Sequence, residues 1–455
     1  MVAKSPSGHS GDRLRRSLSL NGATLLVVSS VIGSGIFFTP GQIAQLLPHA
    51  GLIFVVWIAG GLLSLAGALA NAELGSMFPR AGGDYVYLRE AYSPAAGFLV
   101  GWLTFFVIYI GTIATLAVAF STGLSFFVDY GAGGQLGVAV AIVVGISALN
   151  YVGLRWGTLA NNLTAYLKIG ALLAFTLAAP LLGHGEMTRL ELFSTPLSST
   201  GADLSILAFG AALPPVLFSY LGWNAAIYVA SEIRDPGRNI PRSLFLGLGL
   251  CTLVYLLVNA VYLFALPLET LGGAENVGVL AARSLFGRTG GDLVGILVLG
   301  SILGTLNAMI LIGPRIAYAM AIDGLFFRRV ETVHPRFNTP HIAIVVQAIG
   351  VVVLLFVING FPDSLFLSAL RYATFAIVLA TMADISALYV LRWRRPERHR
   401  PYRAWGYPWL PAVYFLANGG IALAMLLKNP DECLIGLLVA ATGLPFYVWF
   451  VRSSR

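Results

Sequence analysis

The sequence predicts an all-α polytopic membrane protein with twelve transmembrane helices. Of its 455 residues, 57% are hydrophobic and only 11% are charged, against about 25% charged in an ordinary soluble domain. The mean hydropathy is +0.82, and a soluble fold cannot bury so much apolar surface. The same numbers exclude a disordered chain and, despite a net charge of +8, a partner nucleic acid. The expected partner of most of the surface is the lipid bilayer.

Twelve apolar runs are separated by polar or turn-rich breaks. A spanning helix needs roughly 20 mostly apolar residues, which each run supplies. No Pro/Ser-rich linker or change of composition divides the chain into separate folding units. We expect helices near residues 20–47, 51–78, 95–127, 135–153, 157–182, 203–231, 243–267, 291–314, 341–359, 363–391, 409–427 and 432–451.

The distribution of basic residues predicts the orientation of these helices. Lys and Arg concentrate in cytoplasmic loops, and successive loops lie on alternate sides of the membrane. Of the 28 basic residues, 22 lie in the two tails and in the loops on the same side as the tails, whereas 4 lie in the other loops. Both termini are therefore expected to be cytoplasmic, in a multi-pass protein of the cell (plasma or inner) membrane.

Side chains that would support enzyme chemistry or a metal site show no recognisable pattern. The six histidines fall in tails or loops without paired metal-ligand spacing. The sequence contains no His-Glu-x-x-His or Gly-x-Ser-x-Gly motif and no phosphate-binding loop followed by lysine. We expect no enzyme activity, no cofactor and no metal. Cys251 and Cys433 lie in apolar runs and do not signal a disulfide.

The first and sixth predicted helices each contain a segment that is unfavourable in a continuous helix. Gly33-Ser34-Gly35 lies in the middle of the first span, and each glycine costs a helix about 1 kcal/mol relative to alanine. In the sixth span, Pro214-Pro215 precede Phe218-Ser219-Tyr220-Leu221-Gly222-Trp223-Asn224. Proline removes a backbone donor and glycine permits an unwound conformation. Unpaired backbone at this depth is tolerated only where it lines a cavity, and one break at the start of each five-helix half indicates an inverted-repeat transporter.

These two breaks present backbone groups of opposite polarity. The amides of Ser34, Gly35 and Ile36 begin a half-helix, whose positive dipole end suits a carboxylate. Carbonyls that end half-helices suit an ammonium group. Together they favour binding of the zwitterionic end of an amino acid over the alternative, in which the small residues only permit close helix packing. The carbonyls belong to Val31, Ile32, Phe218, Ser219 and Leu221.

Longer motifs over roughly residues 20–390 match one known family. They are Gly33-Ser34-Gly35-Ile36-Phe37, Ala72-Glu73-Leu74-Gly75, Pro79-Arg80-Ala81-Gly82-Gly83-Asp84-Tyr85-Val86-Tyr87, Phe218-Ser219-Tyr220-Leu221-Gly222-Trp223-Asn224 and Glu232-Ile233-Arg234-Asp235-Pro236-Gly237-Arg238-Asn239-Ile240-Pro241-Arg242, with Asn150, Gly153, Gly157, Asn161 and Lys168 between them. With these motifs the chain resembles the L-type amino acid transporter branch of the amino acid–polyamine–organocation (APC) superfamily, in its stand-alone prokaryotic form.

The resemblance implies an overall architecture and a function. The fold would be LeuT-like, with two inverted five-helix repeats, broken helices one and six, and two extra helices. A cytoplasmic tail would occupy residues 1–19 and the transporter core residues 20–391, with repeats over 20–182 and 203–391. Helices eleven and twelve and the C-terminal tail would occupy 392–455. The implied function is sodium-independent transport of neutral L-amino acids by alternating access, most often as an exchanger.

The resemblance also assigns roles to single residues. Ser34 and Gly35 would contact the substrate carboxylate, while the carbonyls of Ile32 and Phe218 would help to hold the amine. The Phe218 ring would close over the substrate on the outer side. Asn224 would brace the unwound stretch of helix six.

Two positions narrow the expected substrate and partners. Relatives often have glycine at the position of Leu221, or a polar or acidic residue where the substrate is cationic, so Leu221 favours small or medium neutral amino acids. Heteromeric relatives carry a cysteine between helices three and four that binds a heavy chain. The corresponding loop, residues 129–136, has none, so no disulfide-linked heavy chain is expected.

Lys168 is the only lysine inside a predicted span. An ammonium group in hydrocarbon is costly unless it faces protein and finds partners. By resemblance it would lie where sodium-coupled relatives bind an ion, between the helix-one break and Ser301 and Thr305, whose i, i+4 spacing places both hydroxyls on one helix face. A fixed cation there would make sodium unnecessary. Two alternatives are snorkelling to the interface and release of a proton from the desolvated ammonium during transport.

Three carboxyl groups in or at the ends of spans have simpler interpretations. Glu73 and Glu232 lie at inner helix ends, where arginine partners in the adjacent loops are expected. For Asp384, inside the tenth helix, we favour a structural hydrogen bond over a role in gating.

The sequence leaves several functions open. Amino acid exchange is the first hypothesis, and a proton-coupled amino acid symporter of the same fold is the alternative. A channel would need a ring of charged pore residues, which the sequence does not suggest. A transport-inactive amino acid sensor would bind ligand without flux, and no appended signalling domain favours it.

Overall fold

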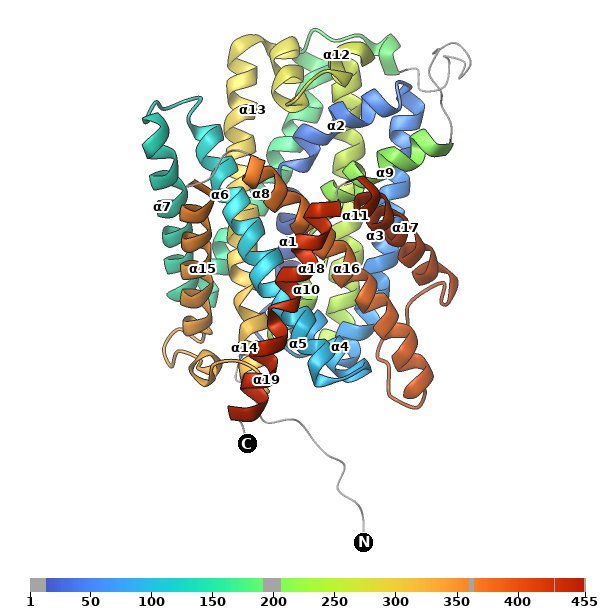
Figure 1. The fold of residues 1–455 in the computed structure, drawn as a ribbon. Helices are drawn as coiled ribbons and strands as arrows, with labels where there is room; N and C mark the ends of the chain where they lie inside the picture. The colour runs from blue at the N-terminus through green and yellow to red at the C-terminus, as the bar shows by residue number, and fades with distance from the viewer. Residues whose placement is uncertain (1–13, 191–205, 360–363, 429, 454–455) are drawn as a thin grey trace.

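In a computed structural model, the chain forms a bundle of helices (Figure 1). The structure describes residues 14–190, 206–359, 364–428 and 430–453, and within them the one β-bridge is an isolated pair, Leu18 with Ile233. A π-helical stretch, η1 (Leu103–Tyr109), joins α5 to α6, and short 3-10 turns form η2 (Met187–Leu190), η4 (Ala230–Glu232) and η5 (Arg328–Glu331). The α-helices are α1 (Leu20–Val31), α2 (Gly35–Leu46), α3 (Ala50–Met77), α4 (Asp84–Ala91), α5 (Pro94–Trp102), α6 (Ile110–Leu124), α7 (Gly131–Tyr151), α8 (Leu154–Leu182), α9 (Ile206–Tyr220), α10 (Ala225–Tyr228), α11 (Pro236–Ala265), α12 (Leu268–Gly272), α13 (Val277–Ile312), α14 (Pro314–Ile322), α15 (His341–Asn359), α16 (Ser364–Arg394), α17 (Trp409–Lys428), α18 (Pro430–Ala441) and α19 (Gly443–Ser453).

The all-α membrane fold class is confirmed. Nine helices of the described chain are long and apolar enough to cross a membrane, and α1 with α2, bent by 48° at their break, would make a tenth. The sixth and twelfth predicted spans are divided. The sixth consists of the 15-residue α9 and the short α10, and the twelfth of α18 and α19 with 12 and 11 residues. The count of twelve spans stays a prediction.

The two prolines of the sixth span do not interrupt it. Pro214 and Pro215 lie inside α9, which continues to Tyr220. Membrane helices tolerate such prolines because neighbouring groups satisfy the freed backbone. The helix ends instead before Gly222, whose φ of 102° is a conformation that L side chains rarely adopt. The predicted break in the sixth helix is therefore confirmed, but the prediction that the prolines contribute to it is wrong.

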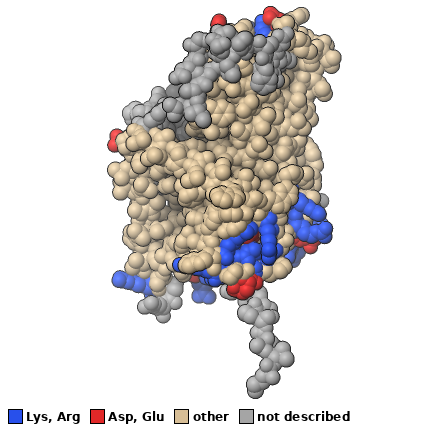
Figure 2. Space-filling view, turned by 90° about the vertical axis from the view of Figure 1, so that its right-hand side faces the viewer, with Lys and Arg blue, Asp and Glu red and all other residues tan. Residues whose placement is uncertain are grey.

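The two ends of the described chain lie at the same end of the bundle. Leu14 packs against Ala81 and Tyr318, close to α4 and α14, and α19 ends nearby, whereas α2 and α12 lie at the other end (Figure 1). We call the end with α4, α14, η5 and residues 395–408 the termini face, and the other end the opposite face. Figure 2 shows most of the visible Lys and Arg atoms gathered at the termini face.

Residues 395–408 fold back onto the termini face and fasten the end of α16 to α3. The buried Glu73 of α3 accepts hydrogen bonds from Arg392 Nε at 3.0 Å, from Arg400 Nε at 3.1 Å and from the Ala404 amide at 2.7 Å. The existence of arginine partners for Glu73 is thus confirmed, but they do not come from the loop that follows it in the sequence. They come from a segment more than 300 residues away in the sequence, which ties the last helices to the first half of the chain.

Glu90 of α4 anchors the same segment from the other side. It accepts a hydrogen bond of 2.8 Å from Arg395 and lies 3.8 Å from Arg398 and 3.7 Å from Arg80. Burial alone would raise the pKa of the Glu90 carboxyl, but the hydrogen bond from Arg395 and the three positive charges hold that pKa below its usual value.

A fully buried ion pair joins η4 to α14. Arg315 Nε lies 2.8 Å from Glu232 Oε1, and Arg315 Nη2 lies 3.2 Å from Glu232 Oε2. The two side chains are 1% and 0% exposed. The bidentate geometry confirms the expected arginine partner of Glu232 and fixes the segment that follows the second helix break.

We expect Arg315→Met to lower the thermal stability of the protein strongly. Removing one partner of a buried ion pair leaves the other charge uncompensated, at a cost of about 3–5 kcal/mol. Melting of the purified protein in detergent measures the effect. The control is Arg328→Met, because Arg328 is 95% exposed and 4.0 Å from Glu331, and such surface pairs contribute little. Equal melting temperatures for Arg315→Met and wild type would contradict the prediction.

Candidate functional site

The centre of the bundle is built from two interrupted helices whose breaks contact each other. The first break lies between α1 and α2, and the second between α9 and α10. A Cβ atom on Gly222 would lie 2.6 Å from the carbonyl oxygen of Ser30, and a Cβ atom on Gly35 would lie 2.9 Å from Cα of Ser219. Both distances are shorter than real Cβ atoms allow. The glycines therefore let the two unwound segments cross in direct backbone contact.

Tyr255 of α11 connects the two breaks. Its hydroxyl lies 2.9 Å from the carbonyl oxygen of Val31, the last residue of α1, and 2.9 Å from that of Ser219, near the end of α9. These are carbonyls that lose helical partners where the helices end. The tyrosine is fully buried, so it satisfies part of the unpaired backbone without water.

Lys168 of α8 reaches the first break from behind. Its ammonium lies 3.0 Å from the Ser29 carbonyl, 2.7 Å from the Ile32 carbonyl and 3.0 Å from Oγ1 of Thr305 on α13. Ser301, one turn earlier on α13, donates to the Ile32 carbonyl at 3.1 Å. The predicted position of the ammonium, between the helix-one break and the hydroxyls of helix eight, is confirmed. The side chain is 2% exposed, so it does not snorkel.

The Ile32 carbonyl does not face the substrate side of the break. It accepts from the ammonium of Lys168 and from Ser301, whereas the single hydroxyl proton of Thr305 has a nearer acceptor in the Ser29 carbonyl, at 3.0 Å. A carbonyl oxygen has two lone pairs, and these two donors already occupy them. The predicted contact between Ile32 and a substrate amine is therefore replaced by a contact with the lysine of the protein itself.

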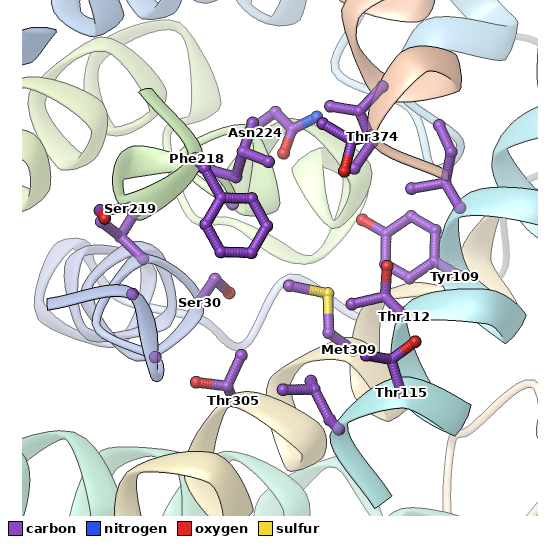
Figure 3. Close-up of a pocket in the computed structure, with 18 of the residues that line it drawn as sticks. Ser30, Tyr109, Thr112, Thr115, Phe218, Ser219, Asn224, Thr305, Met309 and Thr374 are labelled. Atoms are coloured by element: carbon purple, nitrogen blue, oxygen red, sulfur yellow. The ribbon is translucent and has the colours of Figure 1, made fainter. Parts of the chain in front are cut away.

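A cavity of about 340 Å³ lies on the other side of the two breaks. Its walls come from the breaks, from α6 and η1, from α13 and from α16, and Asp84 of α4 borders it at one end. Figure 3 shows the Phe218 ring projecting into the middle of this cavity, toward Met309. Polar side chains are spread around the ring rather than gathered in one place. They are those of Ser30, Ser34, Asp84, Tyr109, Thr112, Thr115, Ser219, Asn224, Tyr228, Thr305, Thr374 and Thr381.

Most of the predicted binding residues line this cavity. Ser34, Gly35, Phe218, Ser219, Leu221, Asn224 and Thr305 are among its walls. Three predicted residues, Ile36, Lys168 and Ser301, lie behind the walls, as does Ile32. The first-turn amides of α2 have no earlier turn to bond to, and at Ser34 and Gly35 they border the cavity. Asn224 donates to the Tyr228 hydroxyl at 3.3 Å, across one turn of α10.

Sequence reasoning missed the wall formed by η1 and α6. Tyr109, Thr112 and Thr115 point into the cavity from this wall (Figure 3). They lie in a long apolar span, where neutral hydroxyl side chains do not stand out. The π-helical turn of η1 ends at Tyr109, and such turns are frequent at functional sites, but nothing in the residue pattern announces one.

A model of the family described as amino acid permease matches residues 18–431. This match covers both broken helices, the lysine and all four walls of the cavity. The chain belongs to the amino acid permease family.

Relatives of this amino acid permease extend over almost its full length. The serine/threonine exchanger SteT of Bacillus subtilis is 30% identical, over 95% of this chain and 96% of that protein. The large neutral amino acids transporter small subunit 2 of Oryctolagus cuniculus is 29% identical, over 97% of this chain and 81% of that protein. The b(0,+)-type amino acid transporter 1 of Homo sapiens is 30% identical, over 96% and 88%.

The family places the permease in the APC superfamily and confirms the LeuT-like fold class. It also agrees with the resemblance of the sequence to the L-type branch. The names of the relatives describe transporters and an exchanger rather than enzymes. The family and the long apolar helices make this permease a multi-pass membrane protein.

Proposed function

We propose that this permease exchanges neutral L-amino acids across the cell membrane, without sodium, by alternating access. The observation that carries the proposal is the cavity bounded by two broken helices whose backbone is unwound at the same depth. Unwound backbone of two broken helices beside a cavity is typical of the substrate site of inverted-repeat transporters. The names of two relatives, a serine/threonine exchanger and a large neutral amino acids transporter, agree on neutral amino acids.

The zwitterionic end of the substrate would lie between the two breaks. The amides of Ser34 and Gly35, at the positive end of α2, suit the carboxylate. Carbonyls at the end of α9, those of Phe218 and Leu221, suit the ammonium. The side chain would then point toward Tyr109, Thr112 and Thr115, whose hydroxyls tolerate polar neutral groups, and the Phe218 ring would close over the substrate.

Lys168 would take the place of a transported cation. Its ammonium bonds to α1 and α13 at once, so it supplies a positive charge that links a moving helix to the scaffold without an ion from solution. Ser301 and Thr305 would complete this link, and Asn224 would brace the second break. The alternative is that the ammonium gives up a proton during transport, which would make the protein a symporter.

The termini face would be cytoplasmic. The excess of arginine in its loops supports this orientation, and the membrane would be the plasma or inner membrane. The core would span residues 20–391, in two repeats over 20–182 and 203–391, between the tail 1–19 and the appended region 392–455. We infer that the permease acts without a disulfide-linked heavy chain, since Cys251 and Cys433 are both buried.

The conformation would be outward-facing. On the termini face, the backbone of Leu18 pairs with Glu232 and Arg234 at 2.9 Å each, and the buried Arg315–Glu232 pair lies behind them. On the side of the opposite face, Phe38 and Phe218 border the cavity and are 40% and 37% exposed. Alternating access would break the contacts on the termini face and close the cavity on the side of the opposite face.

Counterflow in liposomes tests the proposal. Purified permease is reconstituted, the vesicles are loaded with one neutral amino acid, and uptake of a labelled one is followed without sodium. Exchange predicts uptake that requires internal amino acid and ignores an imposed pH gradient. Uptake into empty vesicles driven by inward acid would favour the symporter, non-saturating currents a channel, and ligand binding without flux a sensor.

We expect Leu221→Gly to widen the range of accepted side chains. Leu221 borders the cavity, and a single methylene in such a pocket changes discrimination between substrates by about 1–3 kcal/mol, or roughly 10–200-fold. Competition by a panel of amino acids in the counterflow assay should therefore shift toward bulkier residues by about tenfold. Leu221→Met, of similar volume, should keep the wild-type order of preference. An unchanged order in Leu221→Gly would place the substrate side chain elsewhere.

A further inference from the structure

Two aspartates lie against each other at the termini-face end of the cavity. Asp84 is the first residue of α4 and Asp384 lies in α16, and their side chains are within hydrogen-bonding reach of each other. They are 1% and 0% exposed. Two carboxylates within hydrogen-bonding reach of each other cannot both remain ionised in a buried site unless a cation compensates their charge.

The other buried carboxylates of the described chain have basic partners, whereas this pair has none among the described ion pairs. Glu73 binds Arg392 and Arg400, and Glu232 binds Arg315. No Lys or Arg side chain described by the structure forms an ion pair with Asp84 or Asp384. The negative charge of Asp84 and Asp384 is therefore not balanced by a basic side chain, as the charges of Glu73 and Glu232 are.

The groups that face the pair are neutral. Those on neighbouring elements are the side chains of Asn71 (α3), Tyr87 (α4), Tyr109 (η1), Tyr228 (α10) and Tyr414 (α17). Charged groups on α14, which packs on α4, are engaged elsewhere, since Arg315 binds Glu232 and Asp323 binds Arg89. Of the further helices packed on α16, α6 has no titratable residue, and the titratable residues of α18 lie in its first turn.

The hydrogen-bond donors and acceptors around the two carboxyl groups indicate that one of these groups carries a proton. The Tyr228 hydroxyl donates to Oδ2 of Asp84 at 2.5 Å, which identifies Asp84 as an acceptor. Oδ1 of Asp84 and both carboxyl oxygens of Asp384 are buried and form no hydrogen bond of good geometry among the described residues, although the Asn71 side chain faces Asp384. Buried polar atoms almost always have a partner, and each one left without costs about 1–3 kcal/mol. One proton on Asp384, donated to Oδ1 of Asp84, satisfies two of these three oxygens, and the Asn71 amide can donate to the third.

We propose that Asp84 and Asp384 form a proton-binding site, in which Asp384 carries the proton and donates it to the carboxylate of Asp84. The hydrogen-bonded series Asp384–Asp84–Tyr228 then runs from α16 through α4 to α10. It crosses the end of the cavity on the termini face, where Asp84 and Tyr228 both form the wall. The bound proton acts as a latch that keeps this end of the cavity closed. The role as a latch rests on the proposed transport function, whereas the presence of the proton does not.

Infrared spectroscopy of the purified full-length protein tests the proton directly. At neutral pH, the wild type minus Asp384→Asn difference spectrum should contain the carbonyl stretch of a protonated carboxylic acid. The band should shift in Asp84→Asn, because its hydrogen-bond acceptor has changed, and this variant serves if Asp384→Asn does not fold. The control Asp323→Asn should keep the band, because Arg89 at 2.5 Å compensates Asp323. A wild-type protein without the band, or a band unmoved in Asp84→Asn, overturns the proposal.

Counterflow as a function of pH tests the latch. Exchange by the wild type should fall at alkaline pH, as the shared proton is lost and the two carboxylates repel each other. Asp384→Asn should flatten this profile, because an amide can donate to Asp84 without titrating. A wild-type profile that Asp384→Asn leaves unchanged would overturn the latch. If the wild type shows the infrared band but neither it nor any variant exchanges amino acids, the transport function is refuted and the proton site still holds.

Discussion

Lys168→Ala is expected to reduce amino acid exchange about 100-fold or more. The ammonium bonds to the carbonyls of Ser29 in α1 and of Ile32 just after it, and to Thr305 of α13. A hydrogen bond to a charged group contributes about 1.5–3 kcal/mol. Alanine leaves buried carbonyl oxygens facing a void, and α1 loses its link to the scaffold. The initial rate of counterflow, corrected for the amount of folded protein in the vesicles, measures the loss.

Two variants of the same helix separate the role of the charge from general damage. Gly170→Ala, two residues away, should exchange like the wild type, because no atom lies within 4 Å of the added Cβ. Lys168→Arg should not restore exchange, since Gly304 is packed against the lysine so closely that its own Cβ would lie 2.7 Å from Lys168 Cε, and a guanidinium is larger and planar. Wild-type rates and coupling in Lys168→Ala would refute the assigned role.

Gly35→Val is expected to abolish substrate binding. Already the Cβ atom would lie 2.8 Å from Oγ and 2.9 Å from Cα of Ser219, and the second of these is backbone that cannot rotate away. The substitution therefore forces the two breaks apart and covers the amides that we assign to the carboxylate. Binding of labelled amino acid to the purified protein should fall to background, and counterflow with it.

The matched control for this variant is Gly249→Val in α11. A Cβ atom there meets nothing within 4 Å, so binding should persist. If Gly35→Val bound substrate with wild-type affinity, the close approach of the breaks would not define the site.

Sequence reasoning succeeded where a residue was chemically anomalous in its surroundings. Two glycines in the middle of a span admit few explanations, so the helix breaks could be predicted. A lysine in an apolar run signalled a special role, but the position of Lys168 came from the family resemblance. Prolines are a weaker signal, because a membrane helix absorbs them. Pro214 and Pro215 accordingly misled the assignment of the second break.

Other parts of the site depend on contacts between distant segments. Tyr255 is one tyrosine among 18 and gains its role only by touching Val31 and Ser219. The Ile32 carbonyl was assigned to a substrate because backbone polarity shows which groups are free and not which way they point. Asp384 was expected to form a structural hydrogen bond, but its neighbour Asp84 lies 300 residues earlier, and no periodicity links the two.

The π-helical turn η1 has a consequence for how this fold tolerates changes of chain length. A π turn is an α-helix with an extra residue accommodated, so it rotates everything after it by about 100°, the angle of one residue in a helix. Because of that rotation α5 packs on α4 and α19, while α6 turns Thr112 and Thr115 toward the cavity. Removing a single residue between Leu103 and Tyr109 would give a more regular helix that faces the wrong way. The π turn thus allows a single span to pack on α4 and α19 with its first part and to line the cavity with its second part.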